Sequence, residues 1–249
     1  IMAIDACIIT VRNSSTRLPN KAIIKIFNEF SAIDILIKRS QKTELPVIIA
    51  TSNDPGDDIF EDIAQNHDIK IFRGSLLNKI KRWHDCFTHF DIQNALLVDG
   101  DDLCYNYEIG KRAISLIKKL KVDMVLNPSN IICGFFTYAL NRNGITKLYD
   151  IARSENLDTD VIHKFIQLAN LNTSYINLNE NECNKEIRLT LDYVEDLNFF
   201  KKLYENISIT ANGNDIVNFL ENNIPIKNIN YHKQKDFLDN QKKFNESIK

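Results

Sequence analysis

The sequence lacks the cysteine, histidine and apolar patterns that several classes of protein require. Its five histidines show no H-x-x-x-H spacing. No apolar run approaches the ~20 residues that a membrane-spanning helix needs. The cysteines are odd in number, widely spaced and without a C-x-x-C pair: Cys7, Cys86, Cys104, Cys133 and Cys183. We therefore expect reduced cysteines in a cytoplasmic protein, with no metal centre of cysteine and histidine and no membrane partner.

The charge balance and the few glycines exclude two further classes. The formal net charge is -2, and such a chain has no overall positive field for non-specific binding of nucleic acid. There are 7 glycines, and no G-x-G-x-x-G follows the first apolar run, which argues against a dinucleotide-dependent oxidoreductase. An apolar fraction of 44% and a charged fraction of 26% are ordinary for a globular protein. Any polyanion must therefore be bound locally.

Short apolar runs alternate with helical periods along the chain. The runs have the length and continuous apolarity of strands buried on both faces, and they span residues 4–11, 46–51, 69–72, 95–98, 123–126 and 187–191. Apolar residues recur with helical spacing in residues 31–42, 57–66, 76–90, 108–120 and 194–204. This alternation predicts a Rossmann-like, three-layer α/β fold, with a mostly parallel mixed sheet covered by helices on both faces.

The pattern loosens after residue 126, and we interpret residues 127–185 as an arm inserted into the same fold. Such an arm can cap a site or form an oligomer contact; the alternative is a set of extra core helices. No linker or internal repeat is evident, so residues 1–231 are predicted to form a single domain. Residues 232–249 are polar and are predicted to be a fraying tail.

Cations and small polar residues follow the first predicted strand. The loop contains three cations, Arg12, Arg17 and Lys21, and three hydroxyl side chains, Ser14, Ser15 and Thr16. Charge-assisted hydrogen bonds from such cations are about twice as strong as neutral ones, and the hydroxyls and backbone N–H groups add further donors. Loops of this composition bind phosphate, so the sequence predicts a nucleotide site.

Acidic residues follow two other predicted strands. Asp99, Asp101 and Asp102 come directly after the strand at 95–98, and Asp192 follows the strand at 187–191. Since ligands of parallel sheets lie beyond the carboxyl ends of the strands, these loops are expected to meet the loop of residues 11–21. Mg²⁺ would relieve the repulsion between the three carboxylates after the strand at 95–98, and Asp192 could complete a two-carboxylate site for it. The alternatives are a solvated acidic turn in which Asp101 or Asp102 is a helix N-cap and, for Asp192, an N-cap of the helix that begins at residue 194.

Two arginines add positive charge near the same predicted edge. Arg73 follows the predicted strand at 69–72, and Arg82 lies on the next predicted helix. They could contact a nucleotide, although solvated arginines are common on the surfaces of α/β proteins.

Four segments share motifs with one family. They are Arg12 with Ser15–Lys21, the Phe-Arg-Gly-Ser of residues 72–75 followed by Arg82, the Gly-Asp of residues 100–101, and the Arg-Leu-Thr-Leu-Asp-Tyr-Val-Glu-Asp-Leu of residues 188–197. Together they resemble the SpsF-type cytidylyltransferases and their relatives, including the CMP-octulosonate and CMP-sialate synthetases. The motifs occur in the expected order and cover most of residues 4–205.

The resemblance implies a Mg²⁺-dependent cytidylyltransferase that transfers CMP from CTP to an acidic sugar, sugar phosphate or phosphonate. It assigns Arg12, Arg17 and Lys21 to the triphosphate, with Ser14, Ser15 and Thr16 beside them, Asp101 and Asp192 to Mg²⁺, and Arg73 and Arg82 to the nucleotide or acceptor pocket. It also implies a homodimer. On the predicted arm, Arg142, Lys147 or Arg153 could recognise an anionic acceptor.

Some positions depart from the family pattern. The loop of residues 11–21 has no glycine, so Asn13 is expected to take any left-handed turn. Lys81 stands where the family has aspartate, and Tyr193-Val194 where it has Thr-Pro. These changes leave two alternatives open, a nucleotidyltransferase for another nucleoside triphosphate and a non-catalytic nucleotide-binding module.

Overall fold

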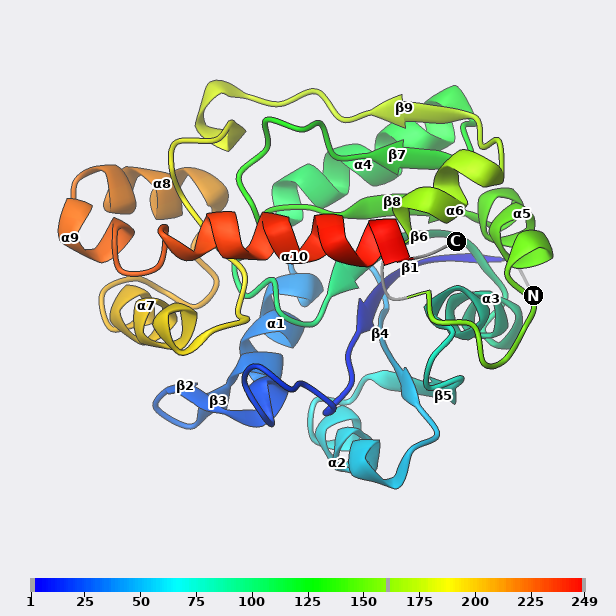
Figure 1. Ribbon diagram of the computed structural model, residues 1–249, viewed down its shortest axis with the longest axis horizontal. Helices are drawn as coiled ribbons and strands as arrows, with labels where there is room; N and C mark the ends of the chain where they lie inside the picture. Colours follow the sequence, from blue (N-terminus) through cyan, green and yellow to red (C-terminus); the bar gives the residue numbers. More distant parts are fainter. Residues whose placement is uncertain (1–2, 160–161, 248–249) are drawn as a thin grey trace.

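A computed structural model describes residues 3–159 and 162–247 of the chain. Its main element is a seven-stranded sheet with the strand order β5-β4-β1-β6-β8-β7-β9 (Figure 1). The strands are β1 (Ile4–Thr10), β4 (Val47–Ser52), β5 (Lys70–Gly74), β6 (Ile92–Asp99), β7 (Met124–Leu126), β8 (Tyr138–Asn141) and β9 (Thr173–Tyr175). Only β8 runs antiparallel to its neighbours within this sheet, so the predicted mostly parallel mixed sheet is confirmed. A short hairpin of β2 (Lys25–Phe27) and β3 (Phe30–Ser31) stands beside it.

Helices cover both faces of the sheet, as the alternating pattern predicted. One face packs in a single apolar cluster with α1 (Ala32–Gln41), α2 (Ile59–Asn66), α4 (Tyr107–Leu120), α7 (Val194–Tyr204) and α8 (Gly213–Glu221). The other face packs against α3 (Lys79–His89), α5 (Arg142–Ile151) and α6 (His163–Leu168). Three 3-10 helices, η1 (Lys21–Ile23), η2 (Pro55–Asp57) and η3 (Glu180–Glu182), and the short helix α9 (Ile224–Lys227) complete this part of the chain.

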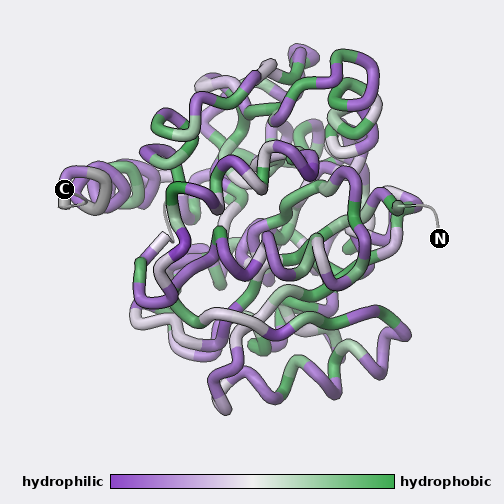
Figure 2. Tube along the Cα trace, turned by 90° about the vertical axis from the view of Figure 1, so that its right-hand side faces the viewer, coloured by the Kyte–Doolittle hydropathy of each residue, from purple (hydrophilic) through white to green (hydrophobic). Residues whose placement is uncertain are grey.

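The carboxyl end of the chain is a helix. Where the sequence predicted a fraying polar tail from residue 232, the structure has α10 (Lys233–Ser247). In Figure 1 this helix crosses the front of the molecule, and in Figure 2 it stands out from the body with a largely hydrophilic trace. Its first half is held by polar contacts to the segment before α7. Those contacts link residues far apart in the sequence, so the composition of the tail alone does not reveal them.

The segment predicted to be an inserted arm contributes to the main sheet. Residues 127–185 contain β8, which pairs with both β6 and β7, and β9, which pairs with β7. Helices α5 and α6 of the same segment join the apolar core on one face of the sheet. The two strands and two helices of residues 127–185 are thus part of the sheet and of the apolar core. This arrangement is closer to the alternative of extra core helices than to a separate arm.

The apolar run at residues 187–191 is not a strand of the sheet. It is buried and extended, with one isolated bridge between Arg188 and Cys133. The backbone N–H of Leu189 donates to the carbonyl of Cys133 at 2.9 Å, and that of Leu191 donates to the carbonyl of Asp101 at 2.9 Å. The run therefore bonds to loops at the carboxyl ends of the strands, which we call the carboxyl edge.

Candidate active site

A close backbone contact brings the loop after β1 against the loop after β6. The N–H of Gly100 donates to the carbonyl of Thr10 at 2.9 Å, and a Cβ at Gly100 would lie 2.8 Å from that carbonyl oxygen. Glycine is needed here because a side chain would separate the two loops. The left-handed turn of the first loop falls at Asn20, with φ of 56°, and not at Asn13 as expected. That turn precedes the 3-10 helix that carries Lys21.

Lys21 joins the two acidic segments. Its Nζ donates to Asp101 Oδ2 at 2.9 Å, to Asp192 Oδ1 at 2.9 Å and to the carbonyl of Leu191 at 2.9 Å. Arg17 Nη2 donates to the same Oδ1 of Asp192 at 3.0 Å, across 175 residues of sequence. We call these four side chains the Lys21 cluster: Arg17, Lys21, Asp101 and Asp192. The expected meeting of the loops at the carboxyl edge is confirmed for these four residues.

Burial and charge oppose each other within the Lys21 cluster. Burial alone would lower the pKa of Lys21, but the carboxylates of Asp101 and Asp192 outweigh it and raise that pKa. The Asp192 side chain is 2% exposed. Burial favours its neutral form, yet Lys21, Arg17 and Arg188 together hold its pKa below the usual value. The opposite charges of Lys21 and Asp192 therefore stabilise each other in a partly buried site, where charges interact strongly.

Asp102 differs from its neighbours. Burial raises the pKa of Asp102 well above its usual value, and the nearby charges of Asp101 and Asp99 add to that increase. Thr137 Oγ1 lies 3.4 Å from a carboxylate oxygen of both Asp99 and Asp102. Lys21 relieves part of the predicted repulsion between the three carboxylates after β6, and the raised pKa of Asp102 shows that its buried position favours the neutral carboxyl form.

A buried ion pair between Arg188 and Asp196 contacts the backbone and side chain of Asp192 and so holds one residue of the Lys21 cluster in place. The guanidinium of Arg188 is fully buried and binds both carboxylate oxygens of Asp196, at 2.9 Å and 3.0 Å. Asp196 also accepts the backbone N–H groups of Asp192 and Tyr193, at 2.9 Å and 3.0 Å. Arg188 and Asp196 lie in the motif of residues 188–197, but no role was predicted for them. Their positions, four residues before and four residues after Asp192, were the sequence feature that could have indicated a contact with it.

The two acidic segments do not serve as helix caps. The N-cap residue of α4 is Asn106, and that of α7 is Tyr193. The N-cap alternatives for Asp101, Asp102 and Asp192 are therefore not what the structure shows.

Of the remaining predicted site residues, Arg12, Ser15, Arg73 and Arg82 are bound to partners outside the Lys21 cluster. Arg12 Nη1 donates to the carbonyl of Leu76 at 2.7 Å, and Ser15 Oγ accepts from the N–H of Leu18 at 3.4 Å, while Ser14 and Thr16 are exposed. Arg82 is buried, and its Nη1 donates to the carbonyl of Ser75 at 2.6 Å.

Arg73 points toward α2. It binds Asp58 at 2.7 Å, Glu61 at 2.6 Å and the carbonyl of Ser52 at 2.9 Å. These three contacts account for Arg73 as a residue that fixes α2 against β5, and a nucleotide role for it stays a prediction.

Comparison with known proteins assigns the family. A family model described as Cytidylyltransferase matches residues 6–244. This chain belongs to the cytidylyltransferase family. It is therefore a CTP-dependent nucleotidyltransferase. The chain is also similar to Uncharacterized protein MJ1063 of Methanocaldococcus jannaschii, with 25% identity over 237 residues, covering 93% of this chain and 97% of the relative.

Solved structures share the fold. A cytidylyltransferase from Leptospira borgpetersenii serovar Hardjo-bovis superposes with a TM-score of 0.82 at 20% identity, covering 91% of this chain and 97% of that one. A CMP:2-keto-3-deoxy-manno-octonic acid synthetase complexed with CTP superposes with a TM-score of 0.63 at 12% identity, covering 82% of this chain and 99% of that one. The Rossmann-like fold of this cytidylyltransferase is thereby confirmed.

The donor set of the cytidylyltransferase fits Mg²⁺. Within residues 3–159 and 162–247, no group of three or more histidine, cysteine or acidic side chains is placed to hold a metal. Asp101 and Asp192 nevertheless lie close enough to share one ammonium group. Mg²⁺ is commonly bound by one or two carboxylates together with substrate phosphates and water. Two carboxylates that contact Lys21, on the loop predicted to bind phosphate, match that requirement.

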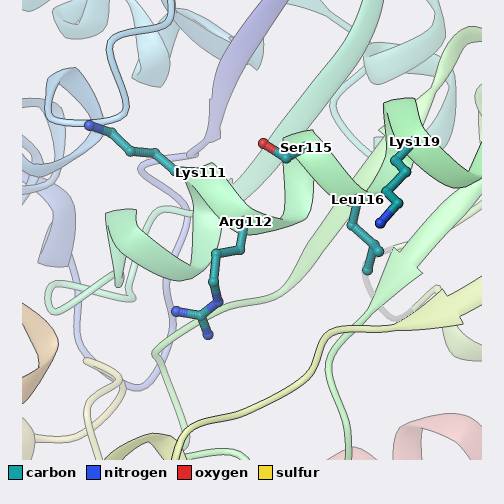
Figure 3. A pocket seen from close by; sticks show the side chains of 5 residues that line it. All are labelled: Lys111, Arg112, Ser115, Leu116 and Lys119. Carbon is teal, nitrogen blue, oxygen red and sulfur yellow. The ribbon is translucent and has the colours of Figure 1, made fainter.

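Within the described part of the chain, cavities also occur outside the Lys21 cluster. One, of about 380 Å³, runs along α4 (Figure 3) and is lined by Lys111, Arg112, Ser115, Leu116 and Lys119. Two of its cations are already neutralised, because Lys111 pairs with Glu44 and Arg112 with Glu182.

A second cavity, of about 330 Å³, lies at the carboxyl edge between α6 and the ends of β7 and β9. We call it the α6 cavity; its lining includes Leu126, Asn127, Tyr138, His163, Ile166, Gln167, Asn170, Leu171, Thr173 and Tyr175. One lining residue, Tyr138, follows Thr137, whose Oγ1 lies 3.4 Å from carboxylate oxygens of Asp99 and Asp102. Among the described helices, none is both long and apolar enough to cross a membrane.

Proposed function

We propose that this cytidylyltransferase transfers CMP from CTP to a small anionic acceptor, with Mg²⁺ and release of pyrophosphate. The observation that carries the proposal is the bonding of Lys21 Nζ to both Asp101 and Asp192, with Arg17 on the same oxygen of Asp192. Cations for a triphosphate and carboxylates for a metal thus share one place at the carboxyl edge. Nucleotidyl transfer needs positioning and charge neutralisation more than a nucleophilic side chain.

The residues of the loop after β1 take the triphosphate in this proposal. Arg12, Arg17 and Lys21 neutralise its phosphates, and Ser14, Ser15 and Thr16 donate hydrogen bonds to it. An acceptor oxygen attacks the α-phosphorus, the bond from that phosphorus to the bridging oxygen breaks, and pyrophosphate leaves with the electron pair. A hydroxyl acceptor loses its proton to solvent. Mg²⁺, held by Asp101 and Asp192, would stabilise the charge on the phosphate oxygens.

The acceptor is proposed to occupy the α6 cavity. Two of the cations expected to recognise it lie at the opposite edge of the sheet: Arg142 pairs with Asp91, next to the first residue of β6, and Lys147 pairs with Asp123, next to the first residue of β7. We therefore propose no acceptor contact for these two residues. Arg153 pairs with Asp150 on the exposed surface of α5.

The lining of the α6 cavity suits the neutral part of an acceptor. Tyrosine, histidine, amide and hydroxyl side chains line it, and its described lining residues include no lysine, arginine or acid. Such side chains recognise a hydroxylated body, so the acceptor's own anionic group would lie nearer the cations of the loop after β1. Sugar acids, sugar phosphates and hydroxylated phosphonates all have this form, which suits a role in glycan or lipid decoration.

One assay tests the function. The protein is incubated with CTP, Mg²⁺ and a panel of octulosonic acid, nonulosonic acid, sugar phosphate and phosphonate acceptors, while pyrophosphate and the mass of any CMP conjugate are measured. A CMP conjugate with one acceptor, absent in excess EDTA, supports the proposal. Turnover only with ATP, GTP or UTP would indicate another nucleotide, and binding of CTP without pyrophosphate from any acceptor would indicate a non-catalytic module.

A further inference from the structure

An aromatic side chain at an unusual position links three parts of the site. Tyr193 stands where the family motif has threonine. Its ring centroid lies 5.3 Å from the guanidinium carbon of Arg17. The guanidinium carbon of Arg188 lies 5.6 Å from the same ring centroid, and Lys233 Nζ lies 5.4 Å from it. A single ring is therefore contacted by cations from the loop after β1, from the segment before α7 and from α10. All three distances lie within the range of cation–π attraction.

Tyr193 is itself restrained at its backbone and at its hydroxyl. The backbone N–H of Tyr193 donates to Asp196, the partner of the buried Arg188. Its hydroxyl accepts a hydrogen bond from Asn240 Nδ2 at 3.1 Å, and Asn240 lies on α10. The same helix packs Phe237 against Arg188, with 4.8 Å between the guanidinium carbon and the ring centroid. The ring is thus attached to the buried core on one side and to the carboxyl-terminal helix on the other.

Arg17 depends on such a support more than Lys21 does. The Arg17 side chain is 43% exposed and that of Lys21 is 17% exposed. Lys21 has three oxygen partners, two of them carboxylates, whereas the contacts described for Arg17 are one carboxylate oxygen of Asp192 and the Tyr193 ring. A flexible arginine loses less conformational entropy on binding a phosphate when an aromatic face already orients its planar guanidinium.

We infer that Tyr193 is a positioning residue for the triphosphate: its ring holds the Arg17 guanidinium beside Asp192, and α10 holds the ring. The inference rests on the proposed function, because it takes Arg17 as a ligand of the phosphates. Tyr193 itself touches no reacting atom in this account. Its effect on the reaction passes entirely through Arg17.

The test measures the affinity for CTP and for inorganic tripolyphosphate by calorimetry, in the presence of Mg²⁺. Tyr193→Met removes the aromatic face and keeps apolar bulk, and we expect it to weaken both ligands by about 2- to 30-fold, the scale of one cation–π contact. Tyr193→Phe keeps the ring and should stay within about twofold of the wild type. In an Arg17→Gln background, Tyr193→Met should cause no further loss, because the group on which it acts is gone.

A merely structural role gives a different pattern. General loosening of the site would weaken both ligands equally in the wild-type and Arg17→Gln backgrounds, and that result would overturn the inference, as would unchanged affinity in Tyr193→Met. Tyr149→Met is the matched control, because Tyr149 also lies against an arginine, Arg153, at 5.8 Å but outside the site. It should leave both affinities unchanged. If Tyr193→Met does not fold, Tyr193→Leu takes its place with the same expectations.

The outcomes separate this inference from the proposed function. Anion binding that follows the expected double-mutant pattern, without CMP transfer to any acceptor, would refute the proposed function and leave the positioning role of Tyr193 intact. CMP transfer, together with equal losses of affinity from Tyr193→Met in the wild-type and Arg17→Gln backgrounds, would support the proposed function and refute the positioning role of Tyr193. A wild type that binds neither CTP nor tripolyphosphate would refute both.

Discussion

Replacing Asp192 by asparagine should damage both stability and activity, because this carboxylate is the most heavily used group of the site. It lies 2.9 Å from Lys21 Nζ, 3.0 Å from Arg17 and 3.5 Å from Arg188, and its side chain is 2% exposed. Removing one partner of a buried ion pair typically costs about 3 to 5 kcal/mol. Lys21 keeps Asp101 and Arg188 keeps Asp196, so we expect the lower end, about 3 kcal/mol.

The assays follow from that magnitude. In a protein of this size, a loss of about 3 kcal/mol lowers the melting temperature by about 6 to 12 °C. Pyrophosphate release should fall at least about 100-fold, the scale on which single electrostatic groups act in transition states. Urea unfolding, thermal unfolding and a pyrophosphate assay measure the three quantities.

The matched control for Asp192→Asn is Asp150→Asn. Asp150 also pairs with an arginine, but both side chains of that pair are more than half exposed. The control should change the free energy of unfolding by less than about 0.5 kcal/mol and leave turnover unchanged. If Asp192→Asn kept wild-type stability and wild-type pyrophosphate release, both the electrostatic account of the cluster and the assignment of Asp192 to the metal would be refuted.

Three further substitutions test separate parts of the account. Lys21→Met should abolish turnover and lower the melting temperature measured in EDTA. Because this variant leaves two carboxylates facing each other, added Mg²⁺ should raise its melting temperature by more than it raises that of the wild type. Equal Mg²⁺ shifts in thermal unfolding would contradict this. Arg73→Gln should leave the affinity for CTP within about twofold by calorimetry, since Arg73 is already bound to two acids of α2; a tenfold loss would restore its predicted nucleotide role. Asp123→Asn tests acid stability. Burial raises the pKa of Asp123, but its hydrogen bond with Lys147 and those with two neighbouring asparagines outweigh burial and lower it. A lowered pKa stabilises the folded state above the usual carboxyl pKa, and that contribution disappears as the pH falls through the folded value. The stability gap between Asp123→Asn and the wild type should therefore be largest at pH 7 and close below about pH 3 in urea unfolding; a gap independent of pH would contradict it.

The architecture was largely predictable from local patterns. Five of the six predicted strands are strands of the sheet, because continuous apolar runs bounded by polar loops suit the buried interior of a parallel sheet. The sixth, at residues 187–191, is equally apolar and equally buried but pairs with loops. Apolarity specifies burial without specifying the bonding partner. For the same reason, β8 was not distinguished from the loosely patterned segment around it.

The four residues of the Lys21 cluster were also singled out from the sequence, through composition for Arg17 and Lys21 and through position after apolar runs for Asp101 and Asp192. Their connections were not. Arg17 and Asp192 are separated by 175 residues, and no local spacing shows that Lys21 lies between two carboxylates.

Short-range patterns of polarity were enough to predict the layered fold and the chemical groups at the ends of the strands. How those groups are used depends on contacts that form only in the folded chain. Asp101 is bound to Lys21 while Asp102, its neighbour, is buried with a raised pKa, and Arg73 is held by α2 while Arg17 lies on an aromatic ring that α10 restrains. The reason is physical: the charge state and orientation of a side chain depend on its surroundings, and at this edge those surroundings come from distant parts of the chain.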